Sequence, residues 1–274
     1  MNLAESTYYA DPKVSRKTKD EIEADIRGKV EQIRVDFPRT GYRMLLHHLK
    51  RGGIQIGERK LRGILSKFEL QFKHKKKFVK TTDSSHSHEI HPNLIEEMTI
   101  NGINQVWTVD ITYIRINTGF VYLAIVLDLY SRKAIGWAIS KRIDGNLAID
   151  ALTMAIKQRN PPRGVIHHSD RGVQYLCDRY VEILNAHGFY KSCSRKGNPY
   201  DNAWTESFMK TLKYDEVHMR EYETYLDLVE NLPRFIEEVY NKIRLHSSLN
   251  YLPPEEFEIK FAKEVNVNRP VFHL

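Results

Sequence analysis

The chain has 274 residues, a formal net charge of +7 and a hydrophobic content of 41%, which is ordinary for a globular protein. Its longest apolar stretch, 121–129, contains Asp128 and is far shorter than the ~20 residues that cross a bilayer, so no membrane partner is expected. Two cysteines and the lack of an apolar secretory core in the first 20 residues predict a cytoplasmic protein.

The positive charge is concentrated at one end of the chain. Residues 1–80 carry 20 Lys and Arg against 10 Asp and Glu, whereas the remaining 194 residues carry 22 against 25. The length allows a catalytic domain of about 150 residues with one or two smaller modules. A basic module joined to a near-neutral one is therefore expected, with a polyanion as the natural partner of the basic module. The alternative is a solvated basic face that serves solubility.

The first 70 residues have the apolar spacing of helices. Three helices are expected, one that begins at Thr18, one over 42–50 and one over 58–68. The last two are joined by a glycine-containing turn, which is the pattern of a helix-turn-helix whose second helix can enter the major groove of DNA. The expected DNA contacts on that second helix are Arg59, Lys60 and Arg62. The alternative is a helical bundle that only packs or dimerises.

Residues 71–104 have the composition of a linker. A basic run that includes Lys75, Lys76 and Lys77 precedes a polar stretch, and such a segment cannot bury enough apolar surface to fold alone. We expect the basic run to lie along a phosphate backbone, where each neutralised phosphate adds salt-sensitive affinity. The alternative is a flexible tether whose charge is incidental.

From Asn104 the apolar pattern changes to that of strands. Three runs rich in Val, Ile, Tyr and Thr predict an antiparallel meander: 107–116, 120–128 and 133–140. The elements expected next alternate between helix and strand: 147–158, 164–168, 175–187 and 190–194. This order predicts an α/β fold, in which helices cover both faces of a mixed sheet.

Asp110 lies within an apolar strand-like run, 107–114. Its neighbours Val109 and Ile111 are both apolar, as in a central strand that is buried on both faces. A charge there costs several kcal/mol unless it is paired or bound to a metal. The alternative to a metal ligand is an Asp paired with an Arg or Lys.

Asp170 ends the run 165–170 and lies in an expected strand-to-helix loop, where α/β sheets commonly place ligands. The alternative is a turn or helix-capping aspartate. The adjacent His167 and His168 are interpreted as packing or hydrogen-bonding residues rather than as metal ligands.

Glu206 lies on an expected helix, 201–210, away from the apolar stripe of that helix. Asn202, Lys210 and Lys213 share its side, so an amide and ammonium groups flank the carboxylate, which suits a metal site beside a phosphodiester. The alternative is an ordinary surface pair between Glu206 and Lys210, four residues apart.

Carboxylates are the ligands that hard divalent cations prefer. Three that converge can hold a metal pair about 3.5–4 Å apart, which serves the attacking and the leaving oxygens of a phosphodiester. Other chemistries lack their motifs, because the sequence has no Gly-rich phosphate loop, no Gly-x-Ser-x-Gly elbow and no cysteine in its N-terminal module. Asp110, Asp170 and Glu206 therefore predict a DNA-cutting and DNA-joining enzyme.

Four motifs together resemble those of one known family: 107–113 (WTVDITY), 168–175 (HSDRGVQY), 194–202 (SRKGNPYDN, leading to Glu206) and 240–246 (YNKIRLH). The chain resembles the DDE-type transposases of bacterial insertion sequences, specifically the second-reading-frame product with a retroviral-integrase-like core. The resemblance runs from about Thr40 to Phe257, and 35 residues separate Asp170 from Glu206, as in that group.

The resemblance implies a ribonuclease-H-like fold and a catalytic triad of Asp110, Asp170 and Glu206 that binds two Mg²⁺ ions, for which Mn²⁺ substitutes. It implies cleavage at an element end, followed by attack of the new 3′-OH on a second phosphodiester. The implied partners are double-stranded DNA (element ends and target), further copies of the chain on DNA, and a first-reading-frame transposase protein, separate or fused. The expected location is the bacterial cytoplasm, on the nucleoid when DNA is bound.

The expected domains are a DNA-binding module (1–70), a linker (71–104), the catalytic core (105–218) and a helical extension (219–274). The DNA contacts expected beyond the first module and linker are Arg195, Lys196, Asn202, Lys210, Lys213, Arg244 and His246. Two other functions remain open at this point: a metal-dependent nuclease without strand transfer, and a catalytically silent DNA-binding regulator.

Overall fold

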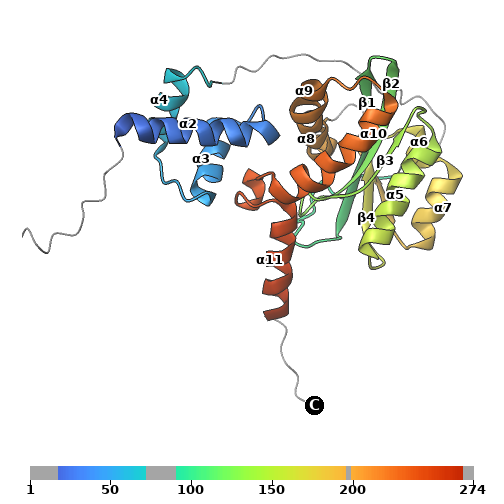
Figure 1. Ribbon diagram of the computed structural model, residues 1–274. Coiled ribbons are helices and arrows are strands. Elements are labelled where there is room, and N and C mark those ends of the chain that lie inside the picture. Colours follow the sequence, from blue (N-terminus) through green and yellow to red (C-terminus); the bar gives the residue numbers. More distant parts are fainter. Residues whose placement is uncertain (1–17, 72–90, 196–198, 268–274) are drawn as a thin grey trace, which may run out of the picture. The chain divides into compact units, whose positions relative to one another are not determined.

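The computed structural model describes residues 18–71, 91–195 and 199–267 (Figure 1). It divides the chain into two compact units, Met1–His74 and Lys75–Leu274. Each unit has a hydrophobic core of its own. Among the helices in these described ranges, none is both long enough and apolar enough to cross a membrane.

In its described part, residues 18–71, the first unit contains three helices: α2 (Lys19–Asp36), α3 (Tyr42–Arg51) and α4 (Glu58–Lys67). A capping box starts α2, because the Thr18 side chain accepts from the backbone N–H of Glu21 while the Glu21 carboxylate accepts from that of Thr18. Between α3 and α4 the chain turns at Gly53, whose φ of +82° suits a residue without a Cβ. The three expected helices are thus confirmed.

The apolar faces of these helices share one core. Its fully buried members are Ile26, Val30, Leu45, Leu49, Leu61, Ile64 and Leu65. At the rim, the Lys67 ammonium at the end of α4 lies 2.7 Å from the buried carboxylate of Glu23 on α2. This pair connects the last turn of α4 to α2. The side of α4 that faces away from the core is exposed.

The second unit is organised around a five-stranded mixed sheet in the order β3-β2-β1-β4-β5. The strands are β1 (Val106–Ile116), β2 (Gly119–Asp128), β3 (Ala134–Ser140), β4 (Ile166–Ser169) and β5 (Tyr190–Cys193). The first three form the expected antiparallel meander, whereas β4 and β5 run parallel to β1. The α/β prediction is confirmed, and β1 is the central strand.

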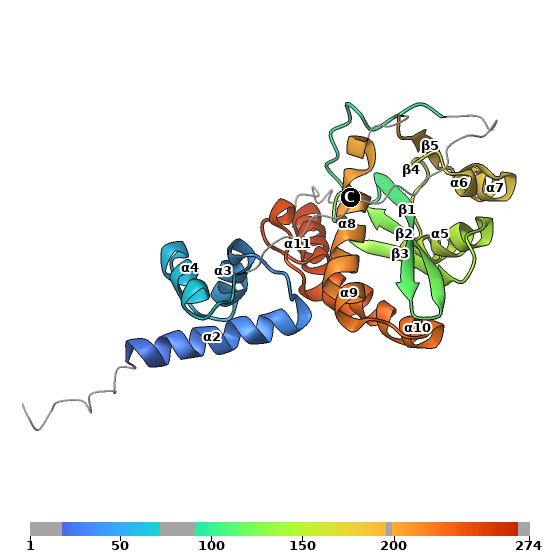
Figure 2. The ribbon, with the colours of Figure 1, turned by 90° about the horizontal axis from the view of Figure 1, so that it is seen from above.

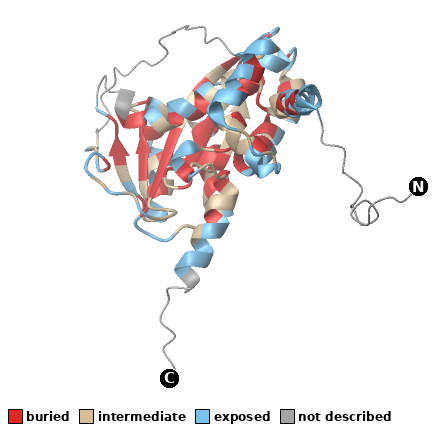
Figure 3. Cartoon of the chain, turned by 90° about the vertical axis from the view of Figure 1, so that its left-hand side faces the viewer, coloured by how far each residue is buried: buried red, intermediate tan, exposed pale blue. Residues whose placement is uncertain are grey.

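Helices cover both faces of this sheet. In Figures 1 and 2, α5 (Gly145–Arg159) and α7 (Asp178–Ala186) lie on one face, and α8 (Ala203–Leu212) lies on the other. Successive side chains of a strand point to opposite faces. Trp107 and Val109 of β1 therefore join the core beneath α5, while Thr108 and Asp110 face α8. Figure 3 shows the strands between these layers as largely buried.

The C-terminal part packs on this core through several short helical segments. They are the π-helical η2 (Lys213–Val217), α9 (His218–Arg220), α10 (Tyr225–Arg234), the π-helical η3 (Phe235–Ile243), the 3₁₀ turn η4 (Ser247–Leu249) and α11 (Pro254–Val267). The Asn241 amide of η3 both donates to and accepts from the backbone of Ala134, at 2.9 Å in each case. This side chain satisfies backbone groups at the start of β3, the strand at the sheet edge.

Two segments differ from what the sequence predicts. The stretch 91–104, assigned to a linker, is packed on the second unit, because Ile95 is buried with Val106 and Leu129. The helix expected over 175–187 is two helices, α6 (Val173–Leu176) and α7. Cys177 between them is extended, and its carbonyl accepts from the N–H groups of Tyr180 and Val181 at the start of α7, so a new helix begins there.

Gly136 on β3 marks the closest approach between the sheet and α5. A Cβ at this position would lie 2.3 Å from the carbonyl oxygen of Ala151 and 2.7 Å from the backbone nitrogen of Ala155. We expect Gly136→Ala to lower the free energy of unfolding by about 3 kcal/mol or more, since backbone atoms cannot move aside cheaply. Urea unfolding checks this, with Gly102→Ala as the control because its Cβ meets only a side chain at 3.4 Å.

Candidate active site

Asp110 lies near the middle of β1, opposite Ile125 of β2, on the face of the sheet that α8 covers. Its Oδ1 accepts a hydrogen bond of 2.8 Å from the backbone N–H of Ile111. The side chain keeps some solvent contact, yet neighbouring strands and helices crowd it on most sides. A strand that is paired on both edges holds this carboxylate in a fixed place.

Asp170 directly follows β4, which runs parallel to β1 with His168 aligned to Thr108. Two residues beyond this aligned pair lie Asp110, on β1, and Asp170, just after the end of β4, on the same face of the sheet. The Asp170 Oδ1 accepts from the N–H of Gly172 at 2.9 Å, which turns the carboxylate back over the loop. A Cβ at Gly172 would lie 3.0 Å from this oxygen, so glycine leaves room for it.

Glu206 is exposed on the first turns of α8. The adjacent Thr205 is buried, and its hydroxyl donates to that of Thr108 on β1 at 3.0 Å. This hydrogen bond fixes α8 over the strand that carries Asp110. Phe208 and Leu212 on the buried side of α8 complete its attachment, so Glu206 projects from a well-anchored helix.

The charges of Asp170 and Glu206 both act on Asp110. Burial, the Asp170 charge and the Glu206 charge together raise the pKa of Asp110 to about 8, against an opposing effect of the Lys213 ammonium. Burial also raises the pKa of Glu206. Asp170 and Glu206, which are 60 and 96 positions from Asp110 in the sequence, therefore lie within its electrostatic reach.

The described side chains do not form a ready-made metal cage. Across the described ranges, no group of three or more His, Cys, Asp and Glu side chains is arranged to hold a metal ion. The donor set itself fits a hard divalent ion, because it consists of carboxylate oxygens that disfavour one another's ionisation.

The two neighbouring histidines are structural. His167 is hydrogen-bonded to the Tyr180 hydroxyl at 2.8 Å, and His168 is held between Ser192 and Ser194. Burial lowers the pKa of His167 to about 3 and that of His168 to about 4, so both rings are neutral. Their interpretation as hydrogen-bonding residues is confirmed.

Two of the expected DNA contacts, Lys210 and Lys213, follow Glu206 in the sequence. The Lys213 ammonium sits 4.5 Å from the ring centroid of Tyr113, and the Asp110 charge acts on it. Burial lowers its pKa. Lys210 is exposed on α8, one turn beyond Glu206. A cation and an acid on adjoining elements suit a phosphodiester placed between them.

Four other residues that were expected to contact DNA are paired with, or buried against, other parts of the protein. Arg195 holds the loop before α8, because its backbone and side chain donate to Asp201 at 2.9–3.1 Å and it pairs with Glu96. Asn202 is buried, and its Oδ1 has no hydrogen-bond partner within the described ranges.

Arg244 pairs with the buried Asp215 at 2.5 Å. The His246 ring stacks edge-on against Tyr240, and burial lowers its pKa to about 3. A neutral, largely enclosed imidazole is a poor phosphate ligand, so this placement favours a structural role for His246.

The remaining expected contacts are divided between α4 and segments that are not described. Arg59, Lys60 and Arg62 are exposed on α4 of the first unit. Lys75, Lys76, Lys77 and Lys196 lie outside the described residues.

Two features of the site were not anticipated. The Thr108–Thr205 hydrogen bond has a partial sequence signal, because strand alternation puts Thr108 on the face of Asp110. Tyr175 is buried with its hydroxyl unpaired within the described ranges, and the Asp110 and Asp170 charges act on it. The sequence alone does not predict the position of Tyr175 near these acids, since a tyrosine on an expected helix is interpreted as a core residue.

Tyr175 and Tyr180 form a matched pair for a stability test, with ring centroids 5.7 Å apart. We expect Tyr175→Phe to leave the metal-free protein as stable as before or more so, because it removes an unpaired buried hydroxyl. Tyr180→Phe is expected to cost about 1–3 kcal/mol, because it leaves His167 without its buried partner. Chemical denaturation of both variants checks this, and equal losses would contradict it.

Comparison with known proteins identifies the family. Residues 101–199 match a family described as integrase core domain, and residues 187–254 match a second model of that description. The chain is 36% identical over 253 residues to the insertion element IS600 uncharacterized 31 kDa protein of Shigella sonnei, covering 90% of this chain and 93% of that protein. It is 38% identical over 223 residues to transposase InsF for insertion sequence IS3A of Escherichia coli (strain K12), covering 81% and 77%.

The chain belongs to the DDE-type insertion-sequence transposases. This transposase is a polynucleotidyl transferase with an integrase core, and its mixed sheet in the order β3-β2-β1-β4-β5 is the ribonuclease-H-like fold. The HTLV-2 integrase catalytic core, solved in complex with magnesium, is similar to the transposase with a TM-score of 0.42 and 17% identity, over 53% of this chain and 92% of that one.

Proposed function

We propose that Asp110, Asp170 and Glu206 are the catalytic residues of this transposase and the ligands of two Mg²⁺ ions, which Mn²⁺ can replace. The observation that carries the proposal is the influence of both Asp170 and Glu206 on the pKa of Asp110. When bound, such an ion pair supplies Lewis-acid stabilisation of the attacking and leaving oxygens of a phosphodiester.

Other roles in the reaction are assigned to the protein's own side chains. Asp110 lies on β1 and Asp170 directly follows the adjacent strand β4, whereas Glu206 on α8 has an exposed side chain that can change rotamer. Lys213, steadied over Tyr113, and Lys210 supply positive charge for the phosphodiester that is cut. Water attacks first and breaks a P–O3′ bond, which releases a 3′-OH and leaves the phosphate on the 5′ side. This 3′-OH then attacks a target phosphodiester in line and displaces the target's 3′-oxygen, with no covalent intermediate on the protein.

The proposed partners follow from this chemistry. The substrates are double-stranded element ends and target DNA, and joining two ends to one target requires more than one copy of the transposase. A first-reading-frame protein, separate or fused, is proposed to contribute end recognition. We place the transposase in the bacterial cytoplasm, on the nucleoid when it holds DNA.

The proposed domain roles retain the expected organisation: DNA binding by 1–70, a basic tether from 71, catalysis by 105–218 and support by 219–274. The packing of residues 91–104 moves the start of the catalytic unit to about His91. Exposed Arg59, Lys60 and Arg62 support DNA binding by the first unit.

A joining assay tests the proposed function. The purified full chain is incubated with Mg²⁺, a labelled duplex that carries the end of its element, and a supercoiled target plasmid, with and without the upstream protein. Labelled plasmid is expected. Cleaved duplex without labelled plasmid would indicate a nuclease, and bound but uncut duplex would indicate a silent regulator.

Lys210 provides a separate test of DNA contact near the acidic residues. Because Lys210 is exposed and adjacent to Glu206, Lys210→Ala is expected to weaken DNA binding and to reduce the slope of log affinity against log salt by about one. Binding measured from 50 to 200 mM salt checks this. An unchanged slope would assign Lys210 to a helix-surface pair with Glu206.

A further inference from the structure

Tyr175 lies on α6, the short helix that follows the Asp170 loop. The residue belongs to the hydrophobic core of the second unit and is 5% exposed. The centroid of its ring lies 6.5 Å from that of His167 and 5.7 Å from that of Tyr180. This packing fixes the ring, and with it the place of the hydroxyl at the end of the ring.

The Tyr175 hydroxyl is buried and has no hydrogen-bond partner in the part of the chain that the structure describes. The polar groups of the two neighbouring rings are occupied, because the Tyr180 hydroxyl and the His167 ring are hydrogen-bonded to each other at 2.8 Å. An unpaired buried hydroxyl destabilises a fold, whereas phenylalanine would fill the same space without that cost. Packing alone therefore does not explain a tyrosine at this position.

The Tyr175 ring lies beside the acidic residues of the site. A Cβ built on Gly172 would lie 3.0 Å from Asp170 Oδ1 and 3.5 Å from Tyr175 Cδ2, so the carboxylate and the ring border the same small space. The Tyr175 N–H donates to the Gly172 carbonyl at 3.0 Å, which holds the start of α6 against this loop. Asp110 lies on β1, the neighbour of the strand that ends just before Asp170. Tyr175 is thus placed at the edge of the proposed metal site.

Both aspartates act on the Tyr175 hydroxyl. Burial, the Asp110 charge and the Asp170 charge all raise the pKa of Tyr175, so the hydroxyl keeps its proton and is a hydrogen-bond donor. The effect of the Asp110 charge is larger than that of the Asp170 charge. One oxygen of Asp110 already accepts from the N–H of Ile111, and a carboxylate has lone pairs for further donors. An unpaired donor and an acceptor with spare lone pairs therefore lie near each other.

We infer that Tyr175 is a positioning residue of the active site, whose hydroxyl donates a hydrogen bond to the Asp110 carboxylate when that carboxylate ligates a divalent ion. This hydrogen bond sets the orientation of the ligand, while the packed ring keeps the donor in place. Removal of such a partner typically lowers metal affinity or activity 10–100-fold. The inference rests on the proposed function, because it takes Asp110 as a metal ligand, and it adds a residue that touches neither the metal nor DNA.

The test removes the hydroxyl and keeps the ring. Full-length wild type and Tyr175→Phe are titrated with Mn²⁺, and the free ion is measured by its electron paramagnetic resonance signal. We expect the dissociation constant for Mn²⁺ to rise 10–100-fold in Tyr175→Phe, while its melting temperature in chelator equals or exceeds that of the wild type. A residue that served only packing would bind Mn²⁺ equally well as tyrosine or phenylalanine.

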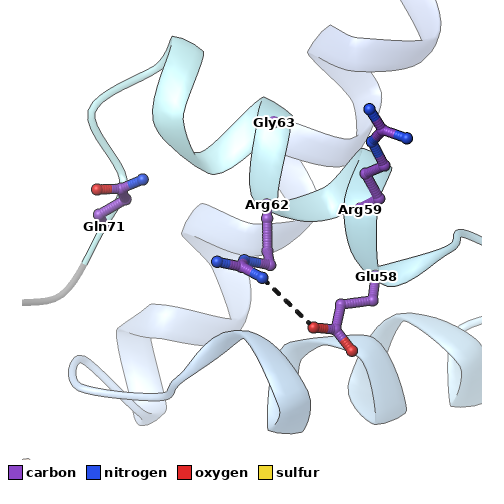
Figure 4. Close-up of a pocket in the computed structure, with 5 residues that line it drawn as sticks. All are labelled: Glu58, Arg59, Arg62, Gly63 and Gln71. Atoms are coloured by element: carbon purple, nitrogen blue, oxygen red, sulfur yellow. Dashed lines mark ion pairs between the residues drawn. The ribbon is translucent and has the colours of Figure 1, made fainter.

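Three further variants are measured in the same way. Tyr180→Phe is the matched control within the core, because the Tyr180 hydroxyl is paired with His167. It is expected to melt at a lower temperature and to keep its Mn²⁺ affinity within twofold. Glu58→Gln controls for weak binding at surface carboxylates, since Glu58 is exposed on α4 of the first unit, 3.6 Å from Arg62 (Figure 4). It is expected to bind Mn²⁺ as the wild type does, whereas Asp110→Asn is expected to lose binding.

Mg²⁺-dependent cleavage of an end-containing duplex provides a second readout. Tyr175→Phe is expected to cleave poorly at limiting Mg²⁺ and to approach the wild-type rate as Mg²⁺ is raised, with unchanged DNA affinity in chelator. The inference is overturned if Tyr175→Phe binds Mn²⁺ within twofold of the wild type, or if Tyr180→Phe loses the same affinity. Wild-type binding by Tyr175→Phe together with loss in Asp110→Asn would overturn this inference alone. Wild-type binding by Asp110→Asn would overturn the proposed function with it.

Discussion

Asp110→Asn is expected to abolish cleavage and joining while DNA binding stays within about twofold of the wild type. The amide removes one negative charge from the proposed metal site on the central strand but keeps the size of the side chain. We expect a loss on the order of 10³-fold or more, as when a preorganised electrostatic group is removed from an active site. The measurement is cleavage and joining of an end-containing duplex in Mg²⁺.

The same substitution has an opposite expected effect on stability. The pKa of Asp110 is raised to about 8 in the folded protein, against about 4 for an ordinary aspartate. Between these values the folded state holds a proton that the unfolded state has released, so the free energy of unfolding falls as pH rises. Asp110→Asn removes this loss, and in chelator the variant is expected to gain on the wild type from pH 4 to pH 8, by on the order of a few kcal/mol.

Asp150→Asn is the control, because Asp150 is exposed on α5, on the far face of the sheet. It is expected to change neither activity nor the pH dependence of unfolding. Activity of Asp110→Asn equal to that of the wild type would remove Asp110 from the catalytic centre. A stability difference that does not change with pH would contradict the raised pKa of Asp110.

Glu258→Ala is expected to lower the free energy of unfolding by roughly 3–5 kcal/mol. Glu258 on α11 accepts from the Ser131 hydroxyl at 2.6 Å and pairs with Arg159 at the end of α5. The Ser131 hydroxyl also lies 3.2 Å from the buried carboxylate of Asp128. Truncating Glu258 leaves the largely buried Arg159 without its acid, which is why the loss is large.

Glu264→Ala on the same helix is the matched control. Glu264 pairs with Lys260 at 4.0 Å, and both side chains are more than 60% exposed. The expected loss is below about 0.5 kcal/mol, since exposed pairs of this kind contribute little. Chemical denaturation of the two variants under one set of conditions checks the contrast, and similar losses would show that the Glu258 contacts do not stabilise the fold.

Local patterns predict much of this fold. The meander strands and α5 begin and end within about two residues of the expected positions, because alternation, short breaks and the capping Asp144 are encoded locally. The break at Cys177 is not, since nothing in the helical pattern of that stretch reveals the contacts that hold it extended. The packing of Ile95 likewise depends on Val106 and Leu129, which lie outside the segment that reads as a linker.

The candidate site likewise combines residues that local sequence patterns predict and residues that only tertiary contacts reveal. An acid in a buried strand and an acid after a strand are visible as anomalies, so Asp110 and Asp170 can be selected from the sequence. Glu206 cannot be distinguished from a surface helix acid without the family resemblance. Arg195 and Arg244 read as free cations, yet the structure gives them the acidic partners Asp201 and Asp215, which are chosen by tertiary geometry.

The close contact at Gly136 has a mechanical consequence. Where a strand and a helix meet backbone to backbone, neither can slide, so the layer behind the acidic residues behaves as a stiff plate. Movement is therefore expected in the opposite layer, where Glu206 lies on the exposed surface of α8.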